Sequence, residues 1–109
     1  MKRDKKERSI VNPCNSLEEV RAEIDALDRQ IVALLARRGG FVKQAARFKT
    51  STADVRAPKR VEQVIIKVTD LADELGASPI IVERVYRAMI AGFIDAEMAE
   101  LANGKRGST

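Results

Sequence analysis

A stripe of apolar residues, spaced by threes and fours between residues 20 and 48, constrains the fold of this sequence more than any other feature. Such spacing is typical of an amphipathic helix with a heptad-like seam. The upstream "SLEE" has the spacing of a capping box, with Ser16 as N-cap and Glu19 three residues later, so the helix is expected to begin there. The stripe consists of Val20, Ile24, Leu27, Ile31, Leu34, Arg38, Phe41, Ala45 and Phe48.

The length of this first helix depends on the glycine pair at positions 39 and 40. Each glycine costs about 1 kcal/mol relative to alanine in a helix interior, so a break at the pair is the competing interpretation. A helix that continues to Lys49 would have about 33 residues and a length of about 50 Å. Two shorter helices of one small subunit would leave much of this rod uncovered, which favours a dimer.

Two further helices are predicted by the same periodicity, over residues 58–75 and from Pro79 to about residue 101. Pro58 suits a first helical turn, and Gly76 suits the left-handed residue after a last turn. The polar segment "TSTADVRA" between the first two helices is expected to be a loop, and no strand pattern is present. We therefore predict an all-α, three-helix subunit over residues 16–101, with disordered tails at 1–15 and 102–109.

Composition and charge exclude several classes of protein and site. The 109 residues include no histidine and a single cysteine, Cys14, which excludes histidine-based metal sites, Ser/His or Cys/His nucleophiles and an internal disulfide. No apolar run approaches the roughly 20 residues that span a bilayer, and the N-terminus lacks a secretory pattern, so we expect a cytoplasmic protein. Residues 1–15 carry +3 and residues 102–109 carry +2 of the net +4, so the body is nearly neutral and nucleic-acid binding is not expected.

Charged residues on the apolar faces are the candidates for chemistry. Arg38 belongs to the seam, and Lys49 follows eleven residues later, which on a continuous helix places the two cations within about 20° of each other. Together they could bind one anion. Glu97 is aligned with the apolar stripe of the third helix. It could stay neutral and donate a hydrogen bond, or form a salt bridge with Arg38 or Lys49, and the pattern leaves both alternatives open.

Arg21 is a further candidate, on the first turns of the long helix. It precedes Arg38 by 17 residues, or about 25 Å, so one subunit cannot bring both to a single small ligand through that helix. Two long helices packed antiparallel would bring Arg21 of one chain toward Arg38 and Lys49 of the other.

The stretches "VRAEIDALDRQIVALLARRGGFVKQAARFKTS", "RAPKRV" and "AEM" resemble the all-helical chorismate mutase family, and within it the isochorismate pyruvate lyases of salicylate formation. The resemblance covers about residues 16–101 and favours a continuous first helix. It implies an intertwined homodimer with two active sites, each completed by the partner's first helix. The implied site contains Arg38, Lys49, Arg60 and Glu97 of one chain and Arg21 of the other.

The resemblance also implies a pericyclic reaction of chorismate or isochorismate, both dicarboxylates, without a metal or organic cofactor. Arg21 and Arg38 would bind carboxylates through their guanidinium groups, and Lys49 would donate to the ether oxygen or a nearby carboxylate. Arg60 would add positive potential near a mobile loop. Glu97 stands where many relatives have glutamine, and a neutral Glu97 could replace that donor.

Two positions bear on which reaction is catalysed. Typical mutases carry an aspartate and a glutamate where this chain has Ala57 and Val61, whereas the lyases are similarly apolar there. This favours an isochorismate pyruvate lyase with chorismate mutase activity. A dedicated chorismate mutase of aromatic amino acid biosynthesis and an aminodeoxychorismate mutase are alternatives. An alternative from another class is a noncatalytic helical dimer that acts as an interaction or regulatory module.

Overall fold

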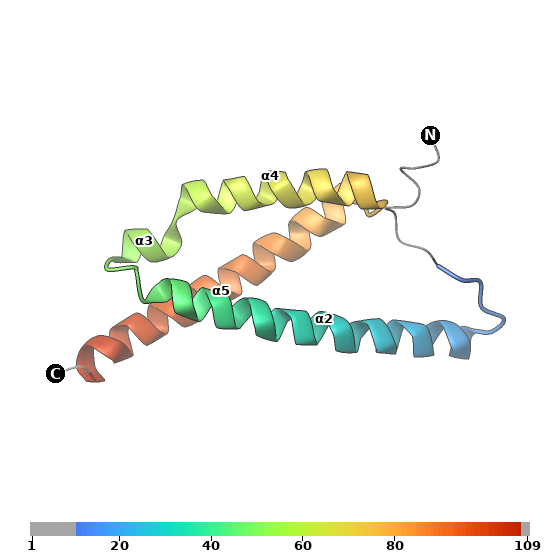
Figure 1. The fold of residues 1–109 in the computed structure, drawn as a ribbon, viewed down its shortest axis with the longest axis horizontal. Helices are drawn as coiled ribbons and strands as arrows, with labels where there is room; N and C mark the ends of the chain where they lie inside the picture. Colours follow the sequence, from blue (N-terminus) through green and yellow to red (C-terminus); the bar gives the residue numbers. More distant parts are fainter. Residues whose placement is uncertain (1–10, 108–109) are drawn as a thin grey trace. The chain divides into compact units, whose positions relative to one another are not determined.

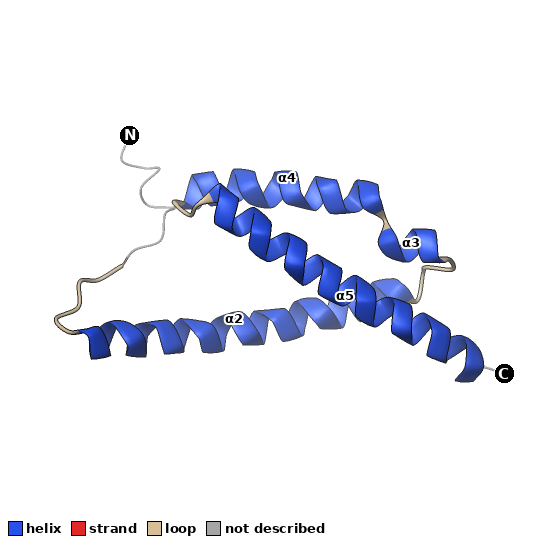
Figure 2. Ribbon diagram, turned by 180° about the vertical axis from the view of Figure 1, so that it is seen from behind, coloured by secondary structure: helices blue, strands red, loops and turns tan. Residues whose placement is uncertain are grey.

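The structure, a computed structural model, describes residues 11–107, with side chains through residue 103. Its helices are α2 (Leu17–Ala46), α3 (Thr52–Arg56), α4 (Pro58–Leu75) and α5 (Pro79–Gly107), and the described range contains no strand (Figures 1 and 2). The all-α class and the three long helices are therefore confirmed. Of the tails expected at residues 1–15 and 102–109, residues 1–10 and 108–109 lie outside the described range. The chain divides into two compact units at Arg47 and Phe48, and each is described by itself.

Helix α2 begins where the capping box predicts. The Ser16 hydroxyl accepts a hydrogen bond from the Glu19 N–H at 3.1 Å, and the Glu19 carboxylate accepts one from the Asn15 N–H at 2.8 Å. The first bond satisfies a donor that the first turn of a helix leaves without a partner, and the second ties the residue before the N-cap to that turn. The start of the long helix is thus specified by a few neighbouring residues.

Helix α2 runs without a break through Gly39 and Gly40 and has 30 residues, a length of about 45 Å. It ends at Ala46, three residues before the predicted end at Lys49. The Arg47 N–H donates to the Gln44 carbonyl at 3.1 Å, the tighter bonding that often closes a last turn. The apolar pattern continues to Phe48 in sequence, but the helix does not.

A short helix, α3, occupies part of the segment expected to be a loop. The Ser51 hydroxyl caps it by accepting the Asp54 N–H at 3.1 Å. Ala57 follows with a φ of 36°, in the left-handed region that residues other than glycine rarely adopt. Pro58 then begins α4, which ends at Leu75 and is followed by Gly76 with a φ of 82°, as predicted.

Helix α5 also begins as predicted, with the Ser78 hydroxyl accepting the Ile81 N–H at 3.2 Å. It extends past residue 101 to Gly107, so the structure places residues 102–107 in a helix and not in a tail. Leu101 and Ala102, on either side of the expected boundary, are good helix formers, so local propensity does not end the helix there. None of the four described helices combines the length and hydropathy that a membrane span requires.

The second unit, which begins at Phe48, is built around α5, which packs against both α4 and α3. Figures 1 and 2 show α5 running back from the turn that follows α4 and continuing past α3. Among the described residues of this unit, the buried side chains are Val55, Val64, Ile65 and Ala72. Only a modest core therefore holds α3, α4 and α5 together.

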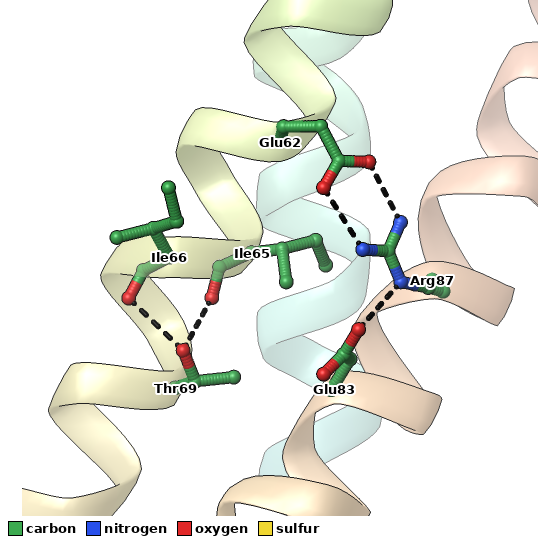
Figure 3. Close-up of polar contacts among 6 residues, drawn as sticks. All are labelled: Glu62, Ile65, Ile66, Thr69, Glu83 and Arg87. Carbon is green, nitrogen blue, oxygen red and sulfur yellow. Dashed lines mark hydrogen bonds and ion pairs between the residues drawn. The ribbon is translucent and has the colours of Figure 1, made fainter.

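Arg87 of α5 joins α4 through polar contacts (Figure 3). Two of its guanidinium nitrogens donate to the two Glu62 oxygens at 3.0 Å each, and its Nε donates to Glu83 at 2.8 Å. The Arg87 hydrogen bonds lower the pKa of Glu62 below its ordinary value of 4.5. The paired geometry sets the register of α4 against α5, although its exposure limits its contribution to stability.

The apolar stripe of α2 lies exposed in the single chain, and none of the helix's residues is buried. Exposure along the stripe ranges from 40% for Val20 to 65% for Phe41. Isolated exposed apolar residues are ordinary, but a row along one helix face is typical of a surface that contacts another protein. The row is formed by Val20, Ile24, Leu27, Ile31, Leu34 and Phe41.

Candidate active site

Lys49 and Glu97 form an ion pair in the second unit, although 48 residues separate them in sequence. Lys49 lies in the turn before α3, and Glu97 lies on α5. The Lys49 Nζ donates to Glu97 Oε2 at 3.2 Å and to Oε1 at 3.5 Å. Two of the predicted site residues are therefore neighbours.

Burial makes this pair different from an ordinary surface salt bridge. The Glu97 side chain is 9% exposed and the Lys49 side chain is 25% exposed. A carboxylate so far removed from water needs a partner for its charge. The sequence left two alternatives for Glu97, a neutral hydrogen-bond donor or a salt bridge. The structure shows a salt bridge, with Lys49.

The surroundings of Glu97 follow from the periodicity of α5. Glu97 is half-buried, as expected for a residue aligned with the apolar stripe of this helix. The other members of the face are also half-buried: Val82, Tyr86, Met89, Ile90 and Phe93. The carboxylate therefore continues this largely apolar row of α5.

The prediction that Lys49 and Arg38 lie on one face of a continuous helix was wrong. Helix α2 ends at Ala46, so Lys49 has no helical register with Arg38. The lysine is held instead by the turn between α2 and α3. In that turn the Thr50 N–H and hydroxyl donate to the Asp54 carboxylate.

The other candidate cations are distributed over both units. Arg60 lies exposed in the first turn of α4, and its side chain makes no hydrogen bond or ion pair among the described residues. Arg21 is exposed and Arg38 half-buried on the unbroken α2, where 17 residues, or about 25 Å, separate them. The joining of all five residues in one site stays a prediction.

Asp54 was not among the residues predicted from the sequence; its carboxylate accepts the backbone N–H of Thr50 at 3.0 Å. Ser51 and Asp54 have the same N-cap and third-position spacing that was used at Ser16 and Glu19. This signal could have predicted α3. The segment as a whole is short and polar, which is typical of a loop, and this led to the prediction of a loop.

The chemistry available at this pair is that of cations and carboxylates. In residues 11–107 no group of three or more His, Cys, Asp or Glu side chains is arranged to hold a metal ion. The Lys49 ammonium has three N–H donors, so it can contact Glu97 and still donate to an anionic ligand. Exposed Arg56, Lys59 and Arg60 add positive charge around the start of α4. The unit is thus suited to a small anion.

Comparison with known proteins decides the family. The model of the family described as chorismate mutase type II matches residues 20–98. The chain belongs to the type II chorismate mutase family. An isochorismate pyruvate lyase of Pseudomonas aeruginosa is 36% identical to it over 95 residues, which cover 87% of this chain and 93% of that protein.

The part of the chain that matches the chorismate mutase family contains all five predicted site residues, from Arg21 to Glu97. It begins in the first turn of α2 and ends within α5, so it takes in both compact units. The Lys49–Glu97 pair therefore lies in the enzyme-like part of the chain and not in an appended segment.

Proposed function

We propose that the protein converts isochorismate to salicylate and pyruvate, with chorismate mutase activity as a second reaction. The proposal rests mainly on the similarity to an isochorismate pyruvate lyase. This similarity spans 93% of that protein's length. The apolar Ala57 and Val61 at the start of α4 support the choice of lyase over mutase. The protein is expected to act in the cytoplasm without a metal or organic cofactor.

The proposed site needs cations because its substrates carry two carboxylates. Arg21 and Arg38 bind the carboxylates through paired guanidinium donors, and Arg60 adds positive potential. Lys49 donates to the ether oxygen whose bond to the ring breaks, where negative charge develops. Holding the enolpyruvyl group over the ring lowers the entropy that must be lost in the transition state. No nucleophile is required.

The role proposed for Glu97 starts from its ion pair with Lys49. An ionised Glu97 fixes the direction of the Lys49 ammonium, which contacts both Glu97 oxygens and keeps at least one N–H donor for the substrate. The other role is that of a neutral donor to the substrate, which requires Glu97 to take up a proton on binding. The observed pairing favours the first role.

A homodimer with shared sites is the proposed assembly. The exposed stripe of α2 supports it, because a helix of about 45 Å with no buried residue is poorly suited to a stable monomer. Antiparallel packing of two α2 helices would cover both stripes and would bring Arg21 of one chain toward Arg38 and Lys49 of the other.

The alternatives predict different products. A dedicated chorismate mutase converts chorismate to prephenate and leaves isochorismate unchanged. An aminodeoxychorismate mutase prefers the amino analogue of chorismate. A noncatalytic helical dimer transforms none of these compounds. The family match and the Lys49–Glu97 pair favour an enzyme over an interaction module.

The test is to offer the purified protein chorismate and isochorismate separately and to identify the products. We expect salicylate and pyruvate from isochorismate at the higher rate, and slower formation of prephenate from chorismate. Lys49→Ala is the control for contaminating enzymes and should be nearly inactive with both. Formation of prephenate alone would identify a dedicated mutase, and no turnover of either compound would overturn the proposed function.

A further inference from the structure

The carboxylate of Asp54 binds the peptide group that follows Lys49. Its Oδ2 accepts the backbone N–H of Thr50 at 3.0 Å and the Thr50 hydroxyl at 3.3 Å. The Thr50 N–H belongs to the same planar peptide unit as the Lys49 carbonyl. A hydrogen bond to this unit therefore restricts the backbone from which the Lys49 side chain extends.

Asp54 is itself held in place by α3. Its own N–H donates to the Ser51 hydroxyl at 3.1 Å, which closes a reciprocal cap around the start of the helix. The next residue, Val55, is 5% exposed and belongs to the core of the second unit. Because α3 packs on α5, the helix that carries Glu97, the backbone of Lys49 is tied to the same helix as its ion-pair partner.

The charge of Asp54 strengthens this contact. The backbone hydrogen bond from Thr50 is the largest cause that lowers the pKa of Asp54 below its ordinary value of 3.8. The carboxylate is therefore ionised throughout the neutral range, and hydrogen bonds to an ionised acceptor are stronger than neutral ones. Asp54 is also exposed, so the core does not depend on its side chain.

We propose that Asp54 is a positioning residue for Lys49, which it holds at the site through the Lys49–Thr50 peptide. A lysine side chain has four rotatable bonds, and freedom of its backbone would add to the disorder of the ammonium. Reactions that depend on orientation are sensitive to such displacement. This inference rests on the proposed function, in which Lys49 contacts the substrate.

The decisive variants are Asp54→Ala, which removes the acceptor, and Asp54→Glu, which restores it. Glutamate is a suitable replacement because Glu19, at the same position of α2, accepts the Asn15 N–H at 2.8 Å. Asp54→Ser, with a shorter arm, serves in place of the alanine variant should that variant not fold. Ser78→Ala is the matched control, because it removes a cap of the same kind at the start of α5, 19 residues from Glu97.

We expect Asp54→Ala to lower kcat/KM about 10- to 100-fold, the loss typical of a displaced catalytic group. Asp54→Glu should recover most of the wild-type rate. Ser78→Ala should lower the melting temperature about as much as Asp54→Ala but leave kcat and KM unchanged. Wild-type kinetics in folded Asp54→Ala would overturn the positioning role.

A second readout does not depend on turnover. Acetylation of Lys49, followed by mass spectrometry of the peptide that contains it, should be faster in Asp54→Ala than in the wild type, with other lysines unchanged. Unchanged labelling would overturn the inference even if the wild-type protein turned over neither substrate. Faster labelling together with an inactive wild type would support the positioning of Lys49 and would count against the proposed function alone.

Discussion

Replacing the partners of the Lys49–Glu97 ion pair singly and together measures what the pair contributes to the fold. Lys49→Met keeps the length of the lysine chain without its charge, and Glu97→Gln keeps the shape of the glutamate without its charge. The four proteins of the cycle are the wild type, the two single variants and the double variant. Their unfolding free energies isolate the coupling between the two side chains.

The structure sets the expected size of this coupling. At the observed Nζ–Oε2 distance of 3.2 Å, two unit charges attract by about 5 kcal/mol at an effective dielectric constant of about 20. The cost of desolvating Glu97, which is 9% exposed, offsets a large part of this attraction. We expect a net coupling of about 2 kcal/mol, as for other hydrogen bonds between charged groups.

The two single variants should differ because their partners differ in burial. Lys49→Met leaves the more buried Glu97 carboxylate without its cation and should cost about 3 kcal/mol. Glu97→Gln leaves the Lys49 ammonium, which is 25% exposed and can reach water, next to an amide oxygen that still accepts a hydrogen bond. Its cost should be about 1 kcal/mol.

Urea unfolding at pH 7, at one protein concentration for all four proteins, measures these differences, and equal slopes of the transitions would justify the comparison. A coupling below about 0.5 kcal/mol would place the pair among ordinary surface salt bridges and would refute the reasoning from burial. A larger loss in Glu97→Gln than in Lys49→Met would refute the assignment of the deeper burial to Glu97.

Three further predictions concern activity, helix propensity and acid stability. Glu97→Gln should keep its activity and the wild-type fall of turnover at alkaline pH, because its amide oxygen still accepts a hydrogen bond from Lys49. Glu97→Ala should lose rate. A flatter fall of turnover at alkaline pH in the Gln variant would show that Glu97 is a neutral donor instead. Gly40→Ala should raise the unfolding free energy by about 1 kcal/mol, because an added Cβ meets nothing within 4 Å and lies about 160° from Arg38 on the helix. A loss of stability in thermal unfolding would contradict this. The pKa of Glu62 is lowered in the folded state, so the stability that Glu62 provides is present above pH 4.5 and is lost as the pH falls below that value. Glu62→Gln should therefore lose less stability in acid than the wild type. An equal loss in the two proteins would count against the Arg87 pairing.

Helix starts and ends that depend on neighbouring residues could be predicted from the sequence. The cap at Ser16, the proline that begins α4 and the glycine that ends it are all where their local chemistry indicates. The continuity of α2 through its two glycines could not be decided by propensity, because the penalty of each glycine is small beside the contribution of a long helix.

The end of α2 and the identity of the site pair depended on interactions that periodicity does not describe. The apolar spacing continues through Phe48, but the hydrogen bonds of Thr50, Ser51 and Asp54 stabilise a turn in place of the last predicted helical turn. Lys49 meets Glu97 across 48 residues because α3 returns the chain to α5. Such a contact is set by packing, and only the choice of candidate residues could come from the pattern.

In the proposed homodimer, each catalytic site combines Lys49 of one chain with Arg21 of its partner. Arg21→Ala and Lys49→Ala should each be nearly inactive as homodimers. In a mixed dimer of the two, one site receives both substitutions and the other receives neither. Random exchange at equal concentrations makes about half of the dimers mixed, so about one quarter of the wild-type activity should return.

The measurement is product formation from isochorismate before and after exchange of the two variants, with formation of mixed dimers verified by mass spectrometry of the intact complexes. Recovery to about one quarter of the wild-type rate is the result predicted for a shared site. No recovery in a sample that contains mixed dimers would contradict the claim, since each site would then take Arg21 and Lys49 from the same chain or would not need both.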